Sequence, residues 1–198
     1  MATLNPAKGR ELAALLAGLP YEVRTLAEFP GARLPDETGD SYAANALPKA
    51  RAAARYTGLL ALGDDSGLEV DALGGAPGLR SARFGGPGLD DAGRCERLLA
   101  ALDGVDEARR GARFRCVIAL VDPAGSERVV EGVVEGVILT APRGRGGFGY
   151  DPLFYYPPLG RTFAELTDDE KAQVSHRGRA VAEVRRLLGE CYTPHAGC

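Results

Sequence analysis

The sequence contains few of the residues that hold soft metal ions or cross-link a small domain. Its 198 residues include no Trp, one Met, two His and four Cys, and no two cysteines form a CxxC pair. A structural zinc site therefore lacks its usual ligand spacing. Cys95 and Cys116 fall in apolar stretches, and we expect both to be buried, reduced thiols.

Long hydrophobic runs and an excess of positive charge are missing as well. No apolar stretch approaches the roughly 20 residues that span a bilayer, and no basic-then-apolar leader opens the chain. The formal net charge of −3 argues against a nucleic-acid coat or a polybasic membrane patch. These features predict a cytoplasmic, soluble protein that binds neither membranes nor nucleic acids.

Hydrophobic periodicity predicts helices that alternate with strands. With 45% hydrophobic residues, the chain is long enough for one core, and we expect a single domain over residues 1–190 followed by a flexible tail, 191–198. The order of elements predicts an α/β fold with a mixed β-sheet flanked by helices. The helices are expected at 6–18, 41–56, 90–102, from 167 and at 175–188, and the strands at 21–26, 59–62, 68–73, 112–121 and 127–139, the last two as a hairpin.

Charged residues gather at the ends of these elements. Lys8 falls in the first turn of a helix, where the helix dipole disfavours a cation unless an anion also binds there. Asp64 and Asp65 follow the buried strand 59–62, and a divalent cation such as magnesium would relieve their mutual repulsion. A solvated lysine and an exposed acidic turn are the alternative interpretations.

Three further segments carry candidate binding groups. The helix at 41–56 has a polar stripe that ends at Lys49, and Glu37 precedes this helix. The loop 146–151 holds aromatic residues between glycines, where a ring can stack on a nucleobase. The segment 175–178 adds hydrogen-bond donors near Lys171. The ordinary alternatives are a solvent-facing helix stripe, a structural turn and a helix cap.

Together these segments supply the groups that a nucleoside triphosphate and its metal ion require. The phosphate-binding loops of other nucleotide-dependent classes are absent, because the sequence has neither GxxxxGK[ST] nor GxGxxG after its first strand. Kinase-like and dinucleotide-dependent enzymes are therefore disfavoured.

Several long motifs connect the sequence with a known family. They are Thr3-x-Asn5-x-x-Lys8, Ser41-Tyr-x-x-Asn45-Ala-x-x-Lys49-Ala, Asp64-Asp-Ser-Gly-Leu-Glu-Val-Asp-Ala-Leu73, Pro77-Gly-x-x-Ser-Ala-Arg-Phe84, Gly146-Gly-Phe-Gly-Tyr-Asp-Pro-Leu-Phe154, Ala164-Glu-Leu-Thr-x-x-Glu-Lys171 and Ser175-His-Arg-Gly178. In these motifs, and over the chain to about residue 188, the sequence resembles the inosine triphosphate pyrophosphatase family, which acts on non-standard purine nucleotides.

The resemblance implies an elongated fold of two lobes with a central cleft, a homodimer and dependence on Mg²⁺. It implies that Asp65 is the catalytic carboxylate and a magnesium ligand, with Glu37 or Asp64 as a further ligand. The resemblance also implies a set of substrate-binding residues. With the lysines named above included, they are Thr3, Asn5, Lys8, Lys49, Ser66, Phe148, Gly149, Tyr150, Asp151, Lys171, His176 and Arg177.

The implied activity is hydrolysis of ITP, dITP or XTP to the monophosphate and pyrophosphate, which cleanses the nucleotide pool. A Maf-type pyrophosphatase acting on pyrimidine or modified nucleotides is one alternative, and a nucleotide-binding module without turnover is another. The sequence departs from the family pattern at Leu4 and Ala7, where glycine is common, at Ala44, where glutamate is frequent, and at Pro48, beside Lys49.

Overall fold

The computed structural model describes residues 1–191 and divides into two compact units. Unit 1 comprises Met1–Asp65, Val117–Gly132 and the chain from Arg177 onward, and unit 2 comprises Ser66–Cys116 and Val133–His176. The tail predicted for 191–198 lies, apart from its first residue, outside the described residues. Among the described residues, no helix has the length and apolar character needed to cross a membrane.

Five strands form one sheet in the order β1-β2-β3-β4-β5. Neighbouring strands are consecutive in the chain and antiparallel, and β3 pairs with β4 so that Val137 lies opposite Tyr155. The connections β2–β3 and β4–β5 are short and allow only antiparallel pairing, because a parallel neighbour needs a long crossover. The α/β class and the hairpin are therefore confirmed, and the sheet is antiparallel where the sequence predicted a mixed one. The strands are β1 Ala61–Val70, β2 Gly111–Val121, β3 Glu127–Ile138, β4 Phe154–Tyr156 and β5 Arg161–Thr162.

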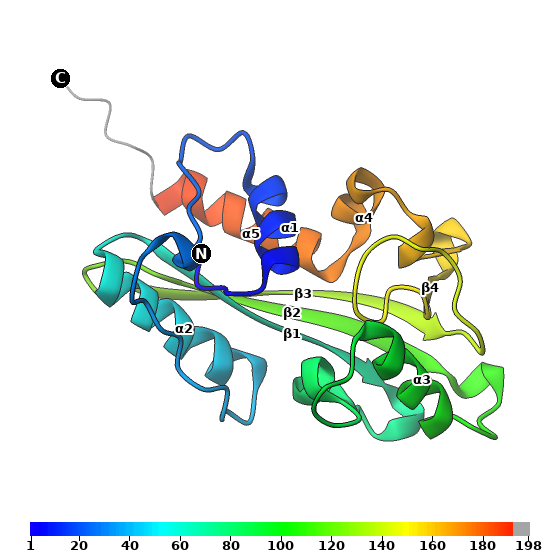
Figure 1. Cartoon of the computed structure of the whole chain (residues 1–198). Coiled ribbons are helices and arrows are strands. Elements are labelled where there is room, and N and C mark those ends of the chain that lie inside the picture. The colour runs from blue at the N-terminus through cyan, green and yellow to red at the C-terminus, as the bar shows by residue number, and fades with distance from the viewer. Residues whose placement is uncertain (192–198) are drawn as a thin grey trace. The chain divides into compact units, whose positions relative to one another are not determined.

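Unit 1 is built on helices that cover both faces of its part of the sheet. α1 (Pro6–Leu16) and α5 (His176–Cys191) lie on one side of the strands, and α2 (Tyr42–Thr57) lies on the other (Figure 1). Residues 117–121 of β2 are consequently all buried, as expected for a strand covered on both faces.

Local signals in the sequence set the ends of these helices. The side chain of Asn5 accepts hydrogen bonds from the backbone N–H groups of Ala7 and Lys8 at the start of α1, and Pro6 occupies the first helical position. Ser41 caps α2 in the same way, and Gly58 ends it in the left-handed region at φ 67°. Pro48 is accommodated inside α2.

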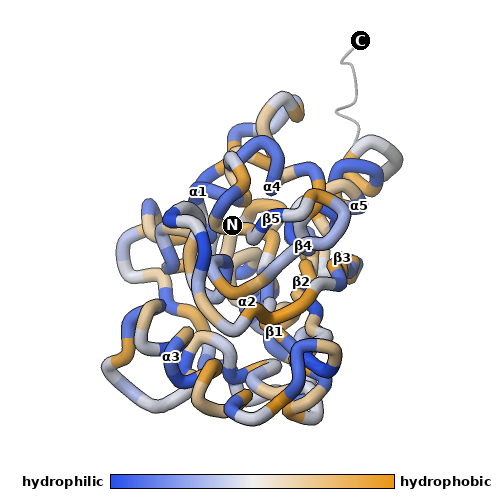
Figure 2. Tube along the Cα trace, turned by 90° about the vertical axis from the view of Figure 1, so that its right-hand side faces the viewer, coloured by the Kyte–Doolittle hydropathy of each residue, from blue (hydrophilic) through white to orange (hydrophobic). Residues whose placement is uncertain are grey.

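Unit 2 has its own hydrophobic core. The rings of Phe114, Phe154 and Phe163 pack together, with centroids 4.6 Å apart for Phe114 and Phe154. Hydrophobic residues are concentrated along β1 and β2 (Figure 2). The helices of this unit are α3 (Asp91–Ala101) and α4 (Asp168–Val174). Short 3-10 helices over both units span Leu26–Glu28, Asp71–Leu73, Gly78–Arg83, Glu107–Arg109, Pro157–Leu159 and Phe163–Glu165.

Three predicted strands differ from the structure. The segment 21–26 is not a strand; its residues 24 and 26 bond to the backbone of Met1, and residues 25 and 26 accept the bonds of the turn that follows. The strands predicted at 59–62 and 68–73 are one strand, β1, so Asp64 and Asp65 lie within it and not in a turn. Gly63 serves helix packing there, since a Cβ would lie 2.6 Å from the carbonyl oxygen of Ala46.

Candidate functional site

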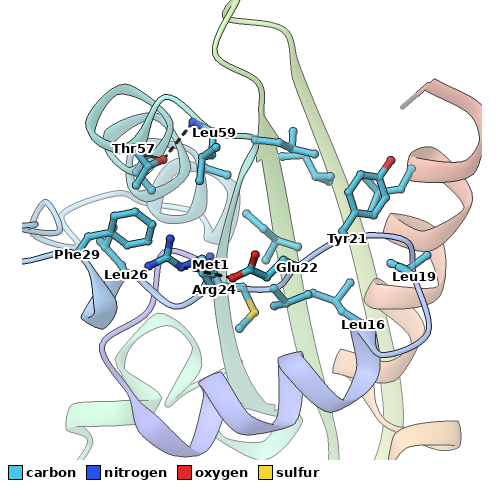
Figure 3. A pocket seen from close by; sticks show the side chains of 17 residues that line it. Met1, Leu16, Leu19, Tyr21, Glu22, Arg24, Leu26, Phe29, Thr57 and Leu59 are labelled. Atoms are coloured by element: carbon cyan, nitrogen blue, oxygen red, sulfur yellow. Dashed lines mark hydrogen bonds and ion pairs between the residues drawn. The ribbon is translucent and has the colours of Figure 1, made fainter. Parts of the chain in front are cut away.

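The cavity that the structure shows most clearly is not the place for a triphosphate. It measures about 240 Å³, lies in unit 1 and is lined mainly by apolar side chains such as Leu16, Leu26 and Phe29 (Figure 3). None of the described residues predicted for the functional site lines it. The predicted site residues are therefore described separately for each unit, as the charged residues of unit 1 and the glycine-rich loop of unit 2.

The first group of charged residues lies where α1 begins. Lys8 extends its ammonium to 2.9 Å from Oδ2 of Asp64, whose side chain is 3% exposed. The hydroxyl of Thr3 accepts a hydrogen bond from the N–H of Asn5, and Asn5 caps the helix. The predicted phosphate-binding segment is thus a tightly ordered helix start.

Positive charge surrounds the carboxylate of Asp64. Burial by itself raises its pKa, but the charges of Lys8, Arg177 and Lys49 outweigh burial and lower the pKa below its usual value. Asp64 therefore stays ionised inside the protein. The metal ion that the sequence predicts at this carboxylate stays a prediction, and the charges of Lys8, Arg177 and Lys49 act on the same group.

Asp65 faces different neighbours, because successive side chains of a strand point to opposite faces. Its Oδ2 accepts a hydrogen bond of 2.9 Å from the amide of Asn45 on α2, and the Asn45 oxygen accepts one from the N–H of Gly39. Burial raises the pKa of Asp65, and the nearby charge of Glu37 raises it further, against the effects of Asn45 and Lys49. Lys49 is buried and lies 2.7 Å from Glu37.

The three carboxylates predicted as metal ligands do not have equal surroundings. The part of the chain that the structure describes contains no cluster of three or more His, Cys, Asp or Glu side chains arranged to hold a metal ion. Asp64 is paired with Lys8 and Glu37 with Lys49, whereas the charges of Asp65 and Glu37 act on each other. Both supply the hard oxygen ligands that Mg²⁺ prefers, and a cation would relieve the mutual repulsion of the two carboxylates.

In unit 2, the glycine-rich loop and α4 bring an aromatic ring, a lysine and an aspartate together. Asp151 is 2% exposed; its Oδ2 accepts a 2.8 Å bond from the N–H of Phe148 and lies 2.5 Å from the ammonium of Lys171. That ammonium also lies 4.9 Å from the centre of the Phe148 ring. Phe148 is half-buried and lies outside the apolar core of the unit, which favours a stacking role over a core role.

Other predicted residues of unit 2 have structural partners. The ring of His176 is buried and stacks on Phe114, with centroids 4.7 Å apart. Tyr150 is buried, and its hydroxyl donates to the carbonyl oxygen of Ser81. Ser66 is half-buried in β1. The substrate contacts predicted for these three residues stay predictions.

Sequence reasoning overlooked the partner of Arg177. This arginine is 3% exposed and donates to Oε2 of Glu11 at 2.6 Å, so α5 is tied to α1. Glu11 lies on α1 one turn after Lys8, and no local pattern in the sequence marked it as the partner of Arg177. Asn45 was visible as part of a polar stripe, but its bond to Asp65 was not.

Comparison with known proteins gives the family. Residues 1–187 match the model of the Ham1 family. The chain belongs to the Ham1 family. A Ham1-family relative from Desulforamulus reducens, named dITP/XTP pyrophosphatase, is 52% identical over 192 residues, which cover 97% of this chain and 96% of the relative.

Solved Ham1-family structures agree with this fold. The HAM1 protein of Coxiella burnetii is 43% identical with a TM-score of 0.86, and 96% of each chain is covered. A structure named nucleoside-triphosphatase / dITP/XTP pyrophosphatase, from Mycobacterium abscessus, is 46% identical with a TM-score of 0.74, covering 94% of this chain and 96% of that one. The family resemblance predicted from the motifs is confirmed.

Proposed function

We propose that this chain hydrolyses non-standard purine nucleoside triphosphates, namely ITP, dITP and XTP, to the monophosphate and pyrophosphate. The observation that carries the proposal is the charged cluster of unit 1, in which Asp65 is held by Asn45 beside Lys49 and Glu37. Relatives that are named dITP/XTP pyrophosphatase, and that are 52% and 54% identical to this chain, support the same activity. These names favour a purine substrate over the Maf-type alternative, and the carboxylates favour turnover over simple binding.

The proposed cofactor is Mg²⁺, held by Asp65 together with Glu37, or with Asp64 in place of Glu37. When bound, the ion would neutralise the negative charge that develops on the leaving pyrophosphate. The departures at Ala7 and Ala44 leave these side chains in place. Ala44 removes one outer carboxylate from the family pattern, so Asp65 and Glu37 carry more of the metal binding.

The residues of this chain supply the rest of the reaction. Water attacks the α-phosphorus, the bond to the bridging oxygen of the β-phosphate breaks, and pyrophosphate leaves. Asp65 orients the water and accepts its proton, a role that its raised pKa favours. Lys8 and Lys49 bind the phosphates, and positioning with charge neutralisation supplies most of the acceleration in such reactions.

The base binds at the loop of unit 2 in this proposal. The ring of Phe148 stacks on the purine, and Lys171 beside it offers a donor to the oxygen at C6. Adenine has an amino group at C6, which donates and does not accept. Protein donors at this place therefore stay unpaired when adenine binds, which costs about 1–3 kcal/mol of binding free energy each. Lys171 was also predicted to hold the triphosphate, and its contacts with Phe148 and Asp151 favour the base instead.

A pyrophosphate-release panel tests the proposal. The wild-type protein is assayed with ITP, dITP, XTP, GTP, ATP, UTP and TTP, with and without Mg²⁺. The expected result is release that depends on Mg²⁺ and favours the first three. Preferred hydrolysis of UTP or TTP would support the Maf-type alternative, and tight binding without release would support a binding module.

We also propose, from the family resemblance, that the protein acts as a homodimer in the cytoplasm. Sedimentation velocity of the purified chain, with a twofold mass expected, tests the dimer. A monomer that is fully active would contradict it. Cell fractionation tests the location.

A further inference from the structure

The glycine-rich loop is held by α3, a helix that none of the site predictions included. The N–H of Gly149 donates a 2.7 Å bond to Oδ2 of Asp91, and the thiol of Cys95 donates to the carbonyl oxygen of Gly149 at 3.4 Å. Asp91 and Cys95 are four positions apart in a helix, so they lie on one face. One face of α3 therefore binds both the N–H and the carbonyl oxygen of Gly149.

Asp91 is itself fixed in place. Its Oδ1 lies 2.7 Å from Nη2 of Arg94, and the same guanidinium donates to the carbonyl oxygen of Leu89 at 2.6 Å. Burial raises the pKa of Asp91, but the bond from Gly149 and the charge of Arg94 outweigh it and lower the pKa. The carboxylate thus stays ionised, and a charged acceptor makes a stronger bond than a neutral one.

The residues on either side of Gly149 are bound as well. Phe148 donates its N–H to Asp151, and the hydroxyl of Tyr150 binds the carbonyl oxygen of Ser81. Gly149 adopts φ 64°, in the left-handed region that favours glycine. Three consecutive residues are anchored, and the half-buried ring of Phe148 extends from this fixed backbone.

We propose that Asp91 is a positioning residue, which acts through Gly149 to hold the Phe148 ring in the orientation that stacks on a purine base. This proposal rests on the proposed function, since it assumes that Phe148 contacts the base of the substrate. It assigns a role to α3, a helix in which no site residue was predicted.

The first experiment measures the loop itself, independently of any activity. Amide hydrogen exchange is compared between the wild type, Asp91→Ala, Asp91→Asn and the control Glu96→Ala, which removes an exposed carboxylate from the same helix. Asp91→Ala should speed exchange at the amides of residues 148–150, whereas Glu96→Ala should leave it unchanged. Asp91→Asn retains an acceptor oxygen but loses the charge, so its exchange should lie between those of the wild type and Asp91→Ala. Unchanged exchange in Asp91→Ala would overturn the proposal, and so would equal damage by Asp91→Asn.

The second experiment separates base binding from phosphate binding. Asp91→Ala should raise KM for ITP and XTP about tenfold with kcat changed less than about twofold, because base stacking contributes uniform binding. The inhibition constant of inorganic tripolyphosphate, which has no base, should not change. Gly149→Ala should reproduce the KM effect from the loop side, because a side chain is strained at φ 64° while its Cβ meets no atom within 4 Å.

The outcomes distinguish this proposal from the proposed function. Faster loop exchange with unchanged KM would overturn the positioning role, as would an equal loss of nucleotide and tripolyphosphate binding, which indicates general disruption. If the wild type releases no pyrophosphate from any nucleotide, the proposed function fails. The affinity for inosine monophosphate, measured by calorimetry, then replaces KM, and an unchanged affinity in Asp91→Ala would again overturn the positioning role.

Discussion

The ammonium of Lys8 lies 2.9 Å from the buried carboxylate of Asp64, whereas Asp65, the next residue, binds Asn45 on the other side of the sheet. Two adjacent aspartates thus belong to different surroundings. The first is neutralised by the protein, and the second has a raised pKa beside Glu37. This difference predicts that the two residues respond differently to the same substitution.

Asp65→Asn should lower kcat for ITP by roughly 10²–10⁴-fold, the usual contribution of a general base. The neutral amide can neither accept the proton of water nor bind Mg²⁺ strongly. The variant should unfold at nearly the wild-type urea concentration, as followed by circular dichroism. Near-wild-type turnover in a folded variant would remove Asp65 from the mechanism.

Asp64→Asn should instead destabilise the protein, by roughly 2–4 kcal/mol, because it leaves the charge of Lys8 in a buried site. Lys8 is 19% exposed, so we expect the lower part of that range. The measurement is the free energy of unfolding from urea titration, with Glu183→Gln on the surface as control. A stability equal to the wild type would show that water solvates the Lys8 ammonium well enough to replace its partner Asp64.

If Arg177 donates a hydrogen bond to the base, Arg177→Ala should lower the ratio of ITP to ATP turnover about tenfold. Each buried donor that is left unpaired costs roughly 1–3 kcal/mol of binding free energy. The bond of Arg177 to Glu11 offers a control, because Glu11→Gln disturbs the same ion pair while keeping the guanidinium. A loss that is equal for ITP and ATP in Arg177→Ala would assign the residue to the fold or to phosphate.

Glu170→Gln should remove a stability contribution that depends on pH. The charge of Arg161 and the bond from Thr167 lower the pKa of Glu170 to about 2, below the roughly 4.3 of an unfolded chain. The folded state therefore binds fewer protons than the unfolded state between these values, and the contribution is complete above about pH 4.5 and lost as the pH falls toward 2. The Tm difference between wild type and variant should be constant from pH 5 to 7 and shrink at pH 3. A difference that does not change with pH would contradict this assignment.

The sequence by itself determined the local structure. The helices expected from residues 6, 41 and 167 begin within one residue of those positions, because the caps Asn5, Ser41 and Thr167 bond only to backbone groups two or three residues away. The motif residues were found for a similar reason, since their spacing along the chain is visible without a fold. The prediction of buried, reduced thiols is also confirmed, since Cys95 and Cys116 are buried and neither is in a disulfide.

Tertiary structure alone decided which charged groups meet. Glu11 and Arg177 are separated by 166 positions yet share a buried ion pair, and no local pattern encodes such a distance. The predicted segments 59–62 and 68–73 belong to one strand, on which α2 packs closely at Gly63, and 21–26 is not a strand. Ion pairs, strand pairing and helix packing all depend on groups brought together from distant parts of the chain, so their outcome is fixed only when the whole chain folds.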